Sequence, residues 1–138
     1  MSAYLDISAA LDGYLAAMSD LPPVAWPNAE FKPTKETLYL RPTVVMGDTV
    51  GGTLGADIED MYSGFYQVDV IAPAGEGKNA ALVMADLVAD RFRRDTIITE
   101  NSREIHCLHS SPLAANNDGA WYVIPVQINF SVLTAERT

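Results

Sequence analysis

The chain has 138 residues, a formal net charge of −9 and a single cysteine, Cys107. The hydrophobic share of 49% and the charged share of 20% are typical of a globular protein, and we expect a single domain spanning 1–138. The acidic excess argues against a nucleic-acid binder, whose affinity depends on Lys and Arg neutralising phosphates, and against attachment to an anionic membrane. One cysteine excludes a disulfide framework within the chain.

The beginning of the chain predicts an amphipathic helix. Apolar residues recur at helical spacing over 3–19, with Asp6 and Asp12 off the apolar stripe. The same two acids interrupt what would be the apolar region of a signal peptide, and no apolar stretch approaches the roughly 18 residues of a membrane span. We therefore expect a protein that is made and kept in cytoplasm. Residues 22–34 are rich in proline and indicate an irregular connection.

Two strands with a long loop between them are expected next. Residues 36–46 are rich in β-formers, and Pro42 places this strand at a sheet edge or at a bulge. Residues 47–61 combine glycines with acids and predict a flexible loop. Residues 62–72 alternate between two faces, which is typical of a half-exposed strand in an antiparallel sheet. One face carries Tyr66, Val68 and Val70, and the other carries Phe65, Gln67 and Asp69.

The second half of the chain predicts a helix over 78–92 and strands over 96–99, 104–110 and 121–133, with a turn at 116–119 before the last strand. The expected apolar stripe of the helix comprises Ala80, Ala81, Met84, Leu87, Val88 and Phe92. We expect the Tyr122–Val132 face of the last strand to meet this stripe. The order of elements predicts an α+β fold, a mainly antiparallel sheet with two principal helices packed on one face.

Acidic residues are concentrated in one part of the chain. Between Pro42 and Gly77 there is no Lys or Arg, while the acids there are Asp48, Asp57, Glu59, Asp60, Asp69 and Glu76. A solvated acidic loop is one interpretation of this pattern, and a surface that meets a partner is the other.

Motifs of small-ligand chemistry are incomplete. The turn from Gly75 to Lys78 lacks two of the four defining positions of a phosphate-binding loop, and the alternating strand before it does not fit a buried βαβ unit. Asp57, Glu59 and Asp60 lack the spacing of a calcium loop. A tight turn and a solvated acidic segment are the simpler interpretations, and we predict no cofactor and no metal.

The segment 106–109 (HCLH) is a further candidate for metal or nucleophile chemistry. On a regular strand Cys107 and His109 share one face, while His106 points away. No second pair of ligands follows at zinc spacing, and adjacent strand residues on opposite faces do not form a nucleophile–base pair directly. Ordinary strand residues with a half-buried thiol are the simpler interpretation, and we predict that the protein is not an enzyme.

Several segments resemble one family. They are 65–77 (FYQVDVIAPAGEG), the Ala-rich helix 79–92, 121–130 (WYVIPVQINF), the leading helix 4–18 and the loop 47–60. Together these segments resemble the phage tail terminator family, also called minor tail or tail completion proteins of lambda-like, long-tailed phages and prophages.

The resemblance implies an α+β fold, assembly as a hexameric ring, and no catalysis or cofactor. The ring binds the growing end of the tail tube, stops polymerisation, and offers a surface to the head connector. The implied partners are further copies of the chain, the tube protein and a head–tail connector protein, with DNA only as the passing genome and no membrane. The implied location is the virion, at the head–tail junction, after assembly in the cytoplasm of the host bacterium.

The surfaces for such an assembly are inferred physically, because the family supplies no short motif. A ring needs two different patches on each subunit, and an open sheet edge is one way to join subunits. We expect a loop facing the lumen or the tube at Asp48, Asp57, Glu59 and Asp60. We expect a subunit interface at Tyr62, Phe65, Arg91, Arg93 and Arg94. Another head–tail connector, neck or tail-tube protein and a small ligand-binding domain or enzyme stay open as alternatives.

Overall fold

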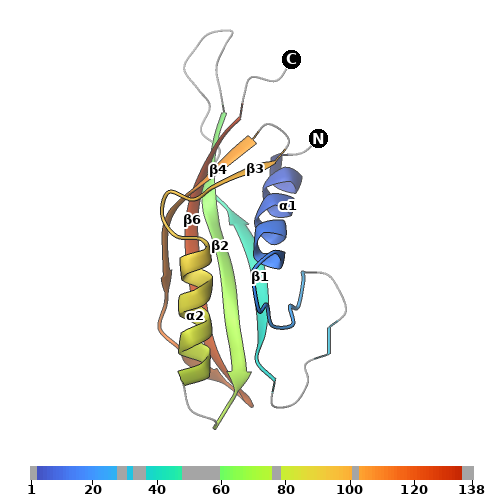
Figure 1. Cartoon of the computed structure of the whole chain (residues 1–138), viewed down its shortest axis with the longest axis vertical. Helices are drawn as coiled ribbons and strands as arrows, with labels where there is room; N and C mark the ends of the chain where they lie inside the picture. The colour runs from blue at the N-terminus through green and yellow to red at the C-terminus, as the bar shows by residue number, and fades with distance from the viewer. Residues whose placement is uncertain are drawn as a thin grey trace.

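The computed structural model describes residues 3–27, 31–32, 37–47, 60–75, 79–100 and 103–134. These residues form an antiparallel sheet with two helices, which confirms the predicted α+β fold (Figure 1). The helices are α1 (Ala3–Ala16) and α2 (Asn79–Arg91). The strands are β1 (Tyr39–Met46), β2 (Asp60–Pro73), β3 (Ile97–Glu100), β4 (Arg103–Pro112), β5 (Asn116–Asp118) and β6 (Trp121–Thr134).

The sheet is built around the two longest strands, and its strand order is β1-β2-β6-β4-β3. The ladder between β2 and β6 is antiparallel and runs without a register shift from Asp60 opposite Thr134 to Pro73 opposite Trp121. The short β5 pairs with the beginning of β6 through a turn in which Gly119 has a positive φ of 61°. The strand predicted to be an edge because of Pro42 is indeed the edge strand β1.

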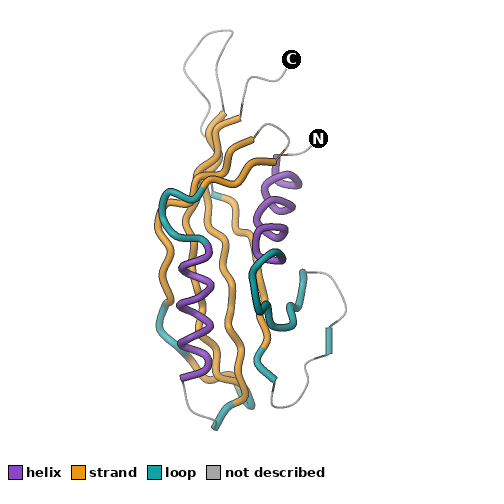
Figure 2. Tube along the Cα trace, viewed as in Figure 1, coloured by secondary structure: helices purple, strands orange, loops and turns teal. Residues whose placement is uncertain are grey.

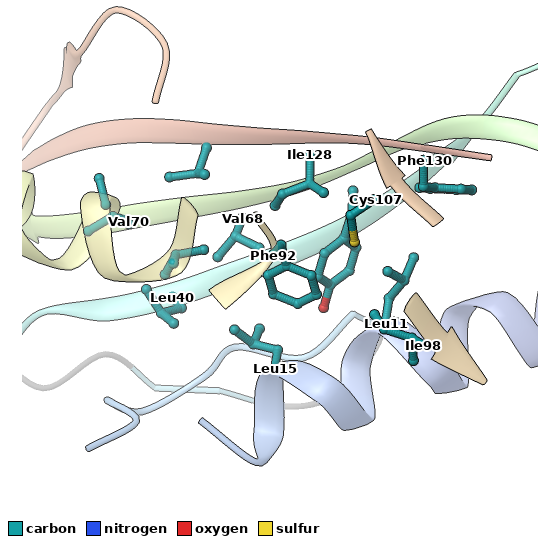
Figure 3. Close-up of a cluster of buried hydrophobic side chains, with 14 of the residues drawn as sticks. Leu11, Leu15, Leu40, Val68, Val70, Phe92, Ile98, Cys107, Ile128 and Phe130 are labelled. Atoms are coloured by element: carbon teal, nitrogen blue, oxygen red, sulfur yellow. The ribbon is translucent and has the colours of Figure 1, made fainter. Parts of the chain in front are cut away.

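Both helices lie on the same face of the sheet, as predicted (Figure 2). Alternate side chains of β2 and β6 point toward the helices, and those labelled in Figure 3 are Val68, Val70, Ile128 and Phe130. From the helical side Leu11, Leu15 and Phe92 complete this core. The period-2 pattern of 121–133 is confirmed, because every second side chain from Ile124 to Val132 is buried.

The buried stripe of α2 differs from the predicted one. The structure buries Ala81, Ala85 and Val88, whereas Ala80 and Leu87 are exposed. The helix is apolar on most of its circumference, so periodicity alone did not identify the side that faces the sheet. Phe92, just after the helix, is fully buried and contacts the rings of Tyr14 and Tyr66.

Asp6 also departs from its predicted place. The pattern placed it on the polar side of the first helix, but the structure buries it and pairs it with Arg103 at the start of β4. The predicted helix over 3–19 ends at Ala16, and the predicted loop 47–61 ends earlier than expected because β2 begins at Asp60. Among the described residues no helix is long and apolar enough to cross a membrane.

Candidate functional site

An open groove of about 580 Å³ lies between α2 and β4. Its lining residues are Asp86, Leu87, Ala89, Asp90, Arg93, Arg94, His109 and Ser110. Two residues of the predicted subunit interface, Arg93 and Arg94, are exposed here just beyond the end of the helix. The groove carries charges of both signs next to an exposed leucine, which is typical of a protein-contact surface rather than of a small-molecule site.

A β-bulge in β4 lies beside this groove and interrupts the regular alternation that the sequence analysis assumed. Leu108 and His109 lie opposite the single residue Asn129 of β6, because the register shifts between Cys107 and Ser110. Cys107 is in the core and His109 is exposed, and the shift breaks the regular alternation on which their predicted common face rests. Burial raises the pKa of the Cys107 thiol to about 11, which keeps it protonated and unreactive at neutral pH.

Ser110, at the end of the bulge, contacts the last turn of α2. Its hydroxyl donates a hydrogen bond of 2.7 Å to the carbonyl oxygen of Ala89. The last four carbonyls of a helix lack partners within the helix, so this bond satisfies one of them. This hydrogen bond joins β4 to α2, the two elements that line the groove.

Arg91, another predicted interface residue, is engaged within the subunit. Its Nε and Nη2 atoms donate hydrogen bonds of 3.0 and 2.8 Å to the carbonyl oxygen of Tyr14 in α1, and its guanidinium carbon lies 3.7 Å from the centre of the Tyr14 ring. The cation thus sits where the C-terminal ends of both helices meet, and it offsets the partial negative charge of both. This contact joins the two helices to each other.

The outward side of α2 carries an apolar ridge that the sequence analysis did not single out. We call Leu82, Val83 and Leu87 the α2 ridge, and their exposed fractions are 39%, 60% and 49%. Three large apolar side chains exposed on one helix of 13 residues are more than scattered surface hydrophobes. The apolar character of 80–88 all around the helix was the signal in the sequence that this helix has a second contact face.

A second hollow of about 410 Å³ lies beside α1, and we call it the α1 recess. It is lined by Ser8, Asp12, Gly13, Ala16, Trp26 and Pro27. Asp12 forms its acidic wall, with Oδ1 accepting a hydrogen bond of 2.6 Å from the buried Tyr66 hydroxyl. Burial raises the pKa of Asp12, and hydrogen bonds from Tyr66 and Ser8 partly oppose that shift.

The face of the sheet opposite the helices is covered only in part. Tyr39, Ile71 and Val123 form a small second core with Ala25, Phe31 and Trp121 packed against it. Farther along, Arg41 donates hydrogen bonds to Asp69, and Gln67 donates one to the other oxygen of the same carboxylate. Phe65, predicted to lie in the subunit interface, is half-buried on this face opposite Val45 and Asn129.

Prolines lie on the edge strand β1 and on the part of β4 beyond its pairing with β3. The N–H and carbonyl of Leu40 bond to Pro23 and Ala25 on the side away from β2, so Pro42, two residues on, also presents its backbone outward. On β4 the N–H of Leu113 bonds inward to β6, which leaves Pro112 facing outward. Each proline withholds a backbone donor at its own position, which weakens strand addition there. The other edge strand, β3, carries no proline.

The acidic residues of the predicted lumen or tube-facing loop are only partly described. Asp48, Asp57 and Glu59 lie outside the described residues, and Asp60 begins β2. The backbone of Tyr62 lies in β2, and its side chain is outside the described set.

The turn and metal candidates show no converging chemistry in the described part of the chain. Gly75 has a positive φ of 88°, as a tight turn requires, and β2 before it is antiparallel to both neighbouring strands, unlike a βαβ unit. Among the described residues no three His, Cys, Asp or Glu side chains are grouped to hold a metal ion.

The comparisons with known proteins agree with this architecture. A family model described as phage tail terminator protein matches residues 6–130. The chain belongs to the phage tail terminator family. Nine chains of solved structures also match this chain, and one of them shares 23% identity over 94% of this chain and 92% of its own, with a TM-score of 0.70. No curated protein matches it. The solved structure shows likeness of fold alone, and the family makes the terminator a structural component of a phage tail.

Proposed function

We propose that this terminator forms a ring that caps the tail tube, stops tail polymerisation and provides the surface for head attachment. The observation that carries the proposal is the family match over residues 6–130, which covers both helices and nearly all of the sheet. Its site would be the tail end at the head–tail junction of the virion, reached after assembly in the host cytoplasm. Its partners would be further copies of itself, the tube protein and a connector protein.

The surface of the subunit supports an assembly role. The α2 ridge and the α1 recess are two different patches, and a closed ring is built from a heterologous contact of this kind. The prolines of β1 and β4 withhold backbone donors from sheet extension at those two positions. These features suit a particle that stops at one ring.

Electron microscopy of a phage lacking this protein tests the function directly. We expect overlong or headless tails in the lysate, and normal heads joined to tails of set length when the wild-type protein is supplied from a second copy. Native mass spectrometry of the purified protein with tail tubes should show closed hexamers. Normal tails without the protein would contradict the proposal, and open-ended stacks of the protein would indicate a tube subunit instead.

The acidic segment of the terminator is proposed to face the lumen or the tube. Its acids Asp48, Asp57, Glu59 and Asp60 come without a neighbouring Lys or Arg between 42 and 77. A negative lumen repels DNA phosphates and limits sticking as the genome passes, whereas a tube-facing segment docks onto basic residues of the tube protein.

Neutralising three of these acids separates the two roles. The triple variant Asp57→Asn, Glu59→Gln, Asp60→Asn should assemble and eject DNA more slowly if the segment faces DNA, and should cap tails poorly if it faces the tube. The matched control is Asp95→Asn with Glu104→Gln, two exposed acids that line neither the groove beside α2 nor the α1 recess. The electrostatic role is ruled out if the triple variant assembles and ejects DNA like the wild type, as measured by tail microscopy and ejection kinetics.

A further inference from the structure

We propose that neighbouring copies of the terminator meet through the α2 ridge of one copy and the α1 recess of the next. This inference rests on the proposed ring and names the contact that builds it. The occupant of the recess is a second copy of this chain.

The two surfaces both present apolar groups. The α2 ridge presents Leu82, Val83 and Leu87 outward, and buried apolar side chains form the centre of stable interfaces. Trp26 and Gly13 both line the α1 recess. A Cβ added at Gly13 would meet nothing within 4 Å. The recess therefore has room for a side chain from outside, next to an indole of the type that anchors many interfaces.

The charges beside the two surfaces are complementary. Arg93 and Arg94 lie in the groove at the end of the ridge, and Asp12 lines the recess while Asp20 is exposed beyond the end of α1. A guanidinium from a neighbouring copy would supply the positive charge that the partly buried Asp12 carboxylate lacks within the described part of its own subunit. Asp86 and Asp90 line the same groove as the arginines, so the ridge is mixed in charge and the pairing also fixes orientation.

The placement of the two surfaces allows a ring. Figure 1 shows α2 on the left of the molecule and α1 with the segment after it on the right. A contact between different patches on opposite sides repeats from copy to copy and closes when the rotation permits, whereas a ridge-to-ridge contact would stop at a dimer. Arg91 joins the two helices inside each subunit, so the ridge and the recess are held in a fixed relation.

Thiol cross-linking tests the contact. The single variants Leu87→Cys and Gly13→Cys are mixed at high concentration with a short bismaleimide. Cross-linked dimer is expected in the mixture and not with either variant alone, and the double variant should give a ladder of oligomers. Cys107 is buried and does not interfere. The control pair Ile97→Cys with Gly13→Cys has a similarly exposed first position, at 52% against 49% for Leu87, and should give no cross-link.

Two substitutions give an independent readout. Leu87→Asp should weaken association about tenfold or more, as expected for a residue at the centre of an interface. Gly13→Phe should fill the recess and cause loss of the ring. Both variants should keep the circular dichroism and melting temperature of the wild-type subunit, because Leu87 is half-exposed and Gly13 faces open space.

The outcomes distinguish this contact from the proposed function. Closed hexamers without a cross-link between positions 87 and 13 overturn the contact and leave the capping function intact. A cross-link of Leu87→Cys with itself also overturns it, in favour of a symmetric dimer. Failure of both ring formation and cross-linking counts against the contact and the ring together.

Discussion

Replacing Asp6 by alanine is expected to lower the free energy of unfolding by about 3–5 kcal/mol, because it leaves a buried guanidinium without its counter-ion. The side chains of Asp6 and Arg103 are 4% and 11% exposed, and the pair joins the first turn of α1 to the start of β4. Arg103 Nε has no hydrogen-bond partner within the described part of the chain, so the lone cation would have little else to stabilise it. Urea denaturation at fixed protein concentration measures the change.

Two further variants make this result specific. Asp86→Ala removes an exposed acid from the other helix and should change the free energy of unfolding by no more than about 0.5 kcal/mol. The double variant Asp6→Leu, Arg103→Met replaces the pair with apolar side chains and should recover most of the loss, since a buried ion pair contributes little net stability. A loss below about 1 kcal/mol for Asp6→Ala would mean that the pair is solvated and the burial argument wrong.

The substitution Gly64→Ala should separate the edge strand from the sheet, at a cost of about 3 kcal/mol, the upper end of the usual range for overpacking. A Cβ at Gly64 would lie 2.2 Å from the carbonyl oxygen of Val45 and 3.0 Å from the Cα of Met46. Both atoms belong to the backbone of β1, which cannot rotate out of the way as a side chain does. The strands must therefore move apart where β1 ends.

Hydrogen exchange localises this effect. The amides of Arg41, Thr43 and Val45 point toward β2 and should lose protection, while the ladder between β2 and β6 keeps it. The matched control is Gly13→Ala, where nothing lies within 4 Å of the added methyl, and it should stabilise the protein by about 0.5–1 kcal/mol through helix propensity. Equal melting temperatures for Gly64→Ala and the wild type would refute the steric argument.

Local periodicity in the sequence was sufficient to predict the strands that form the sheet side of the core. The alternation from Tyr122 to Val132 predicted β6 and its buried face, and Pro42 predicted an edge strand. These signals are local because a strand buried on one face needs an apolar side chain at every second position. The segments 65–77 and 121–130 also carried the resemblance to the family. Most of their residues lie in β2 and β6, the central strand pair of the sheet.

The surfaces of the candidate site depended on contacts between distant segments. The bulge between Cys107 and Ser110 is defined by the register against β6, and alternation within β4 alone did not predict it. Arg91 was expected to face another subunit, whereas its hydrogen bonds to Tyr14 cross from one helix to the other. The sequence did not show which apolar residues form the exposed α2 ridge, because apolar residues occur on nearly every side of this helix.

The sequence by itself determined an acidic α+β protein of the tail terminator family, because composition, alternation and family segments are properties of the chain read in order. Only the tertiary structure decided which charges are buried and which apolar residues remain outside. Asp6 and Arg103 are separated by 97 positions, and no local pattern records that they meet. The same holds for the ridge and the recess, because packing against the sheet buries one side of each helix and leaves the other side exposed.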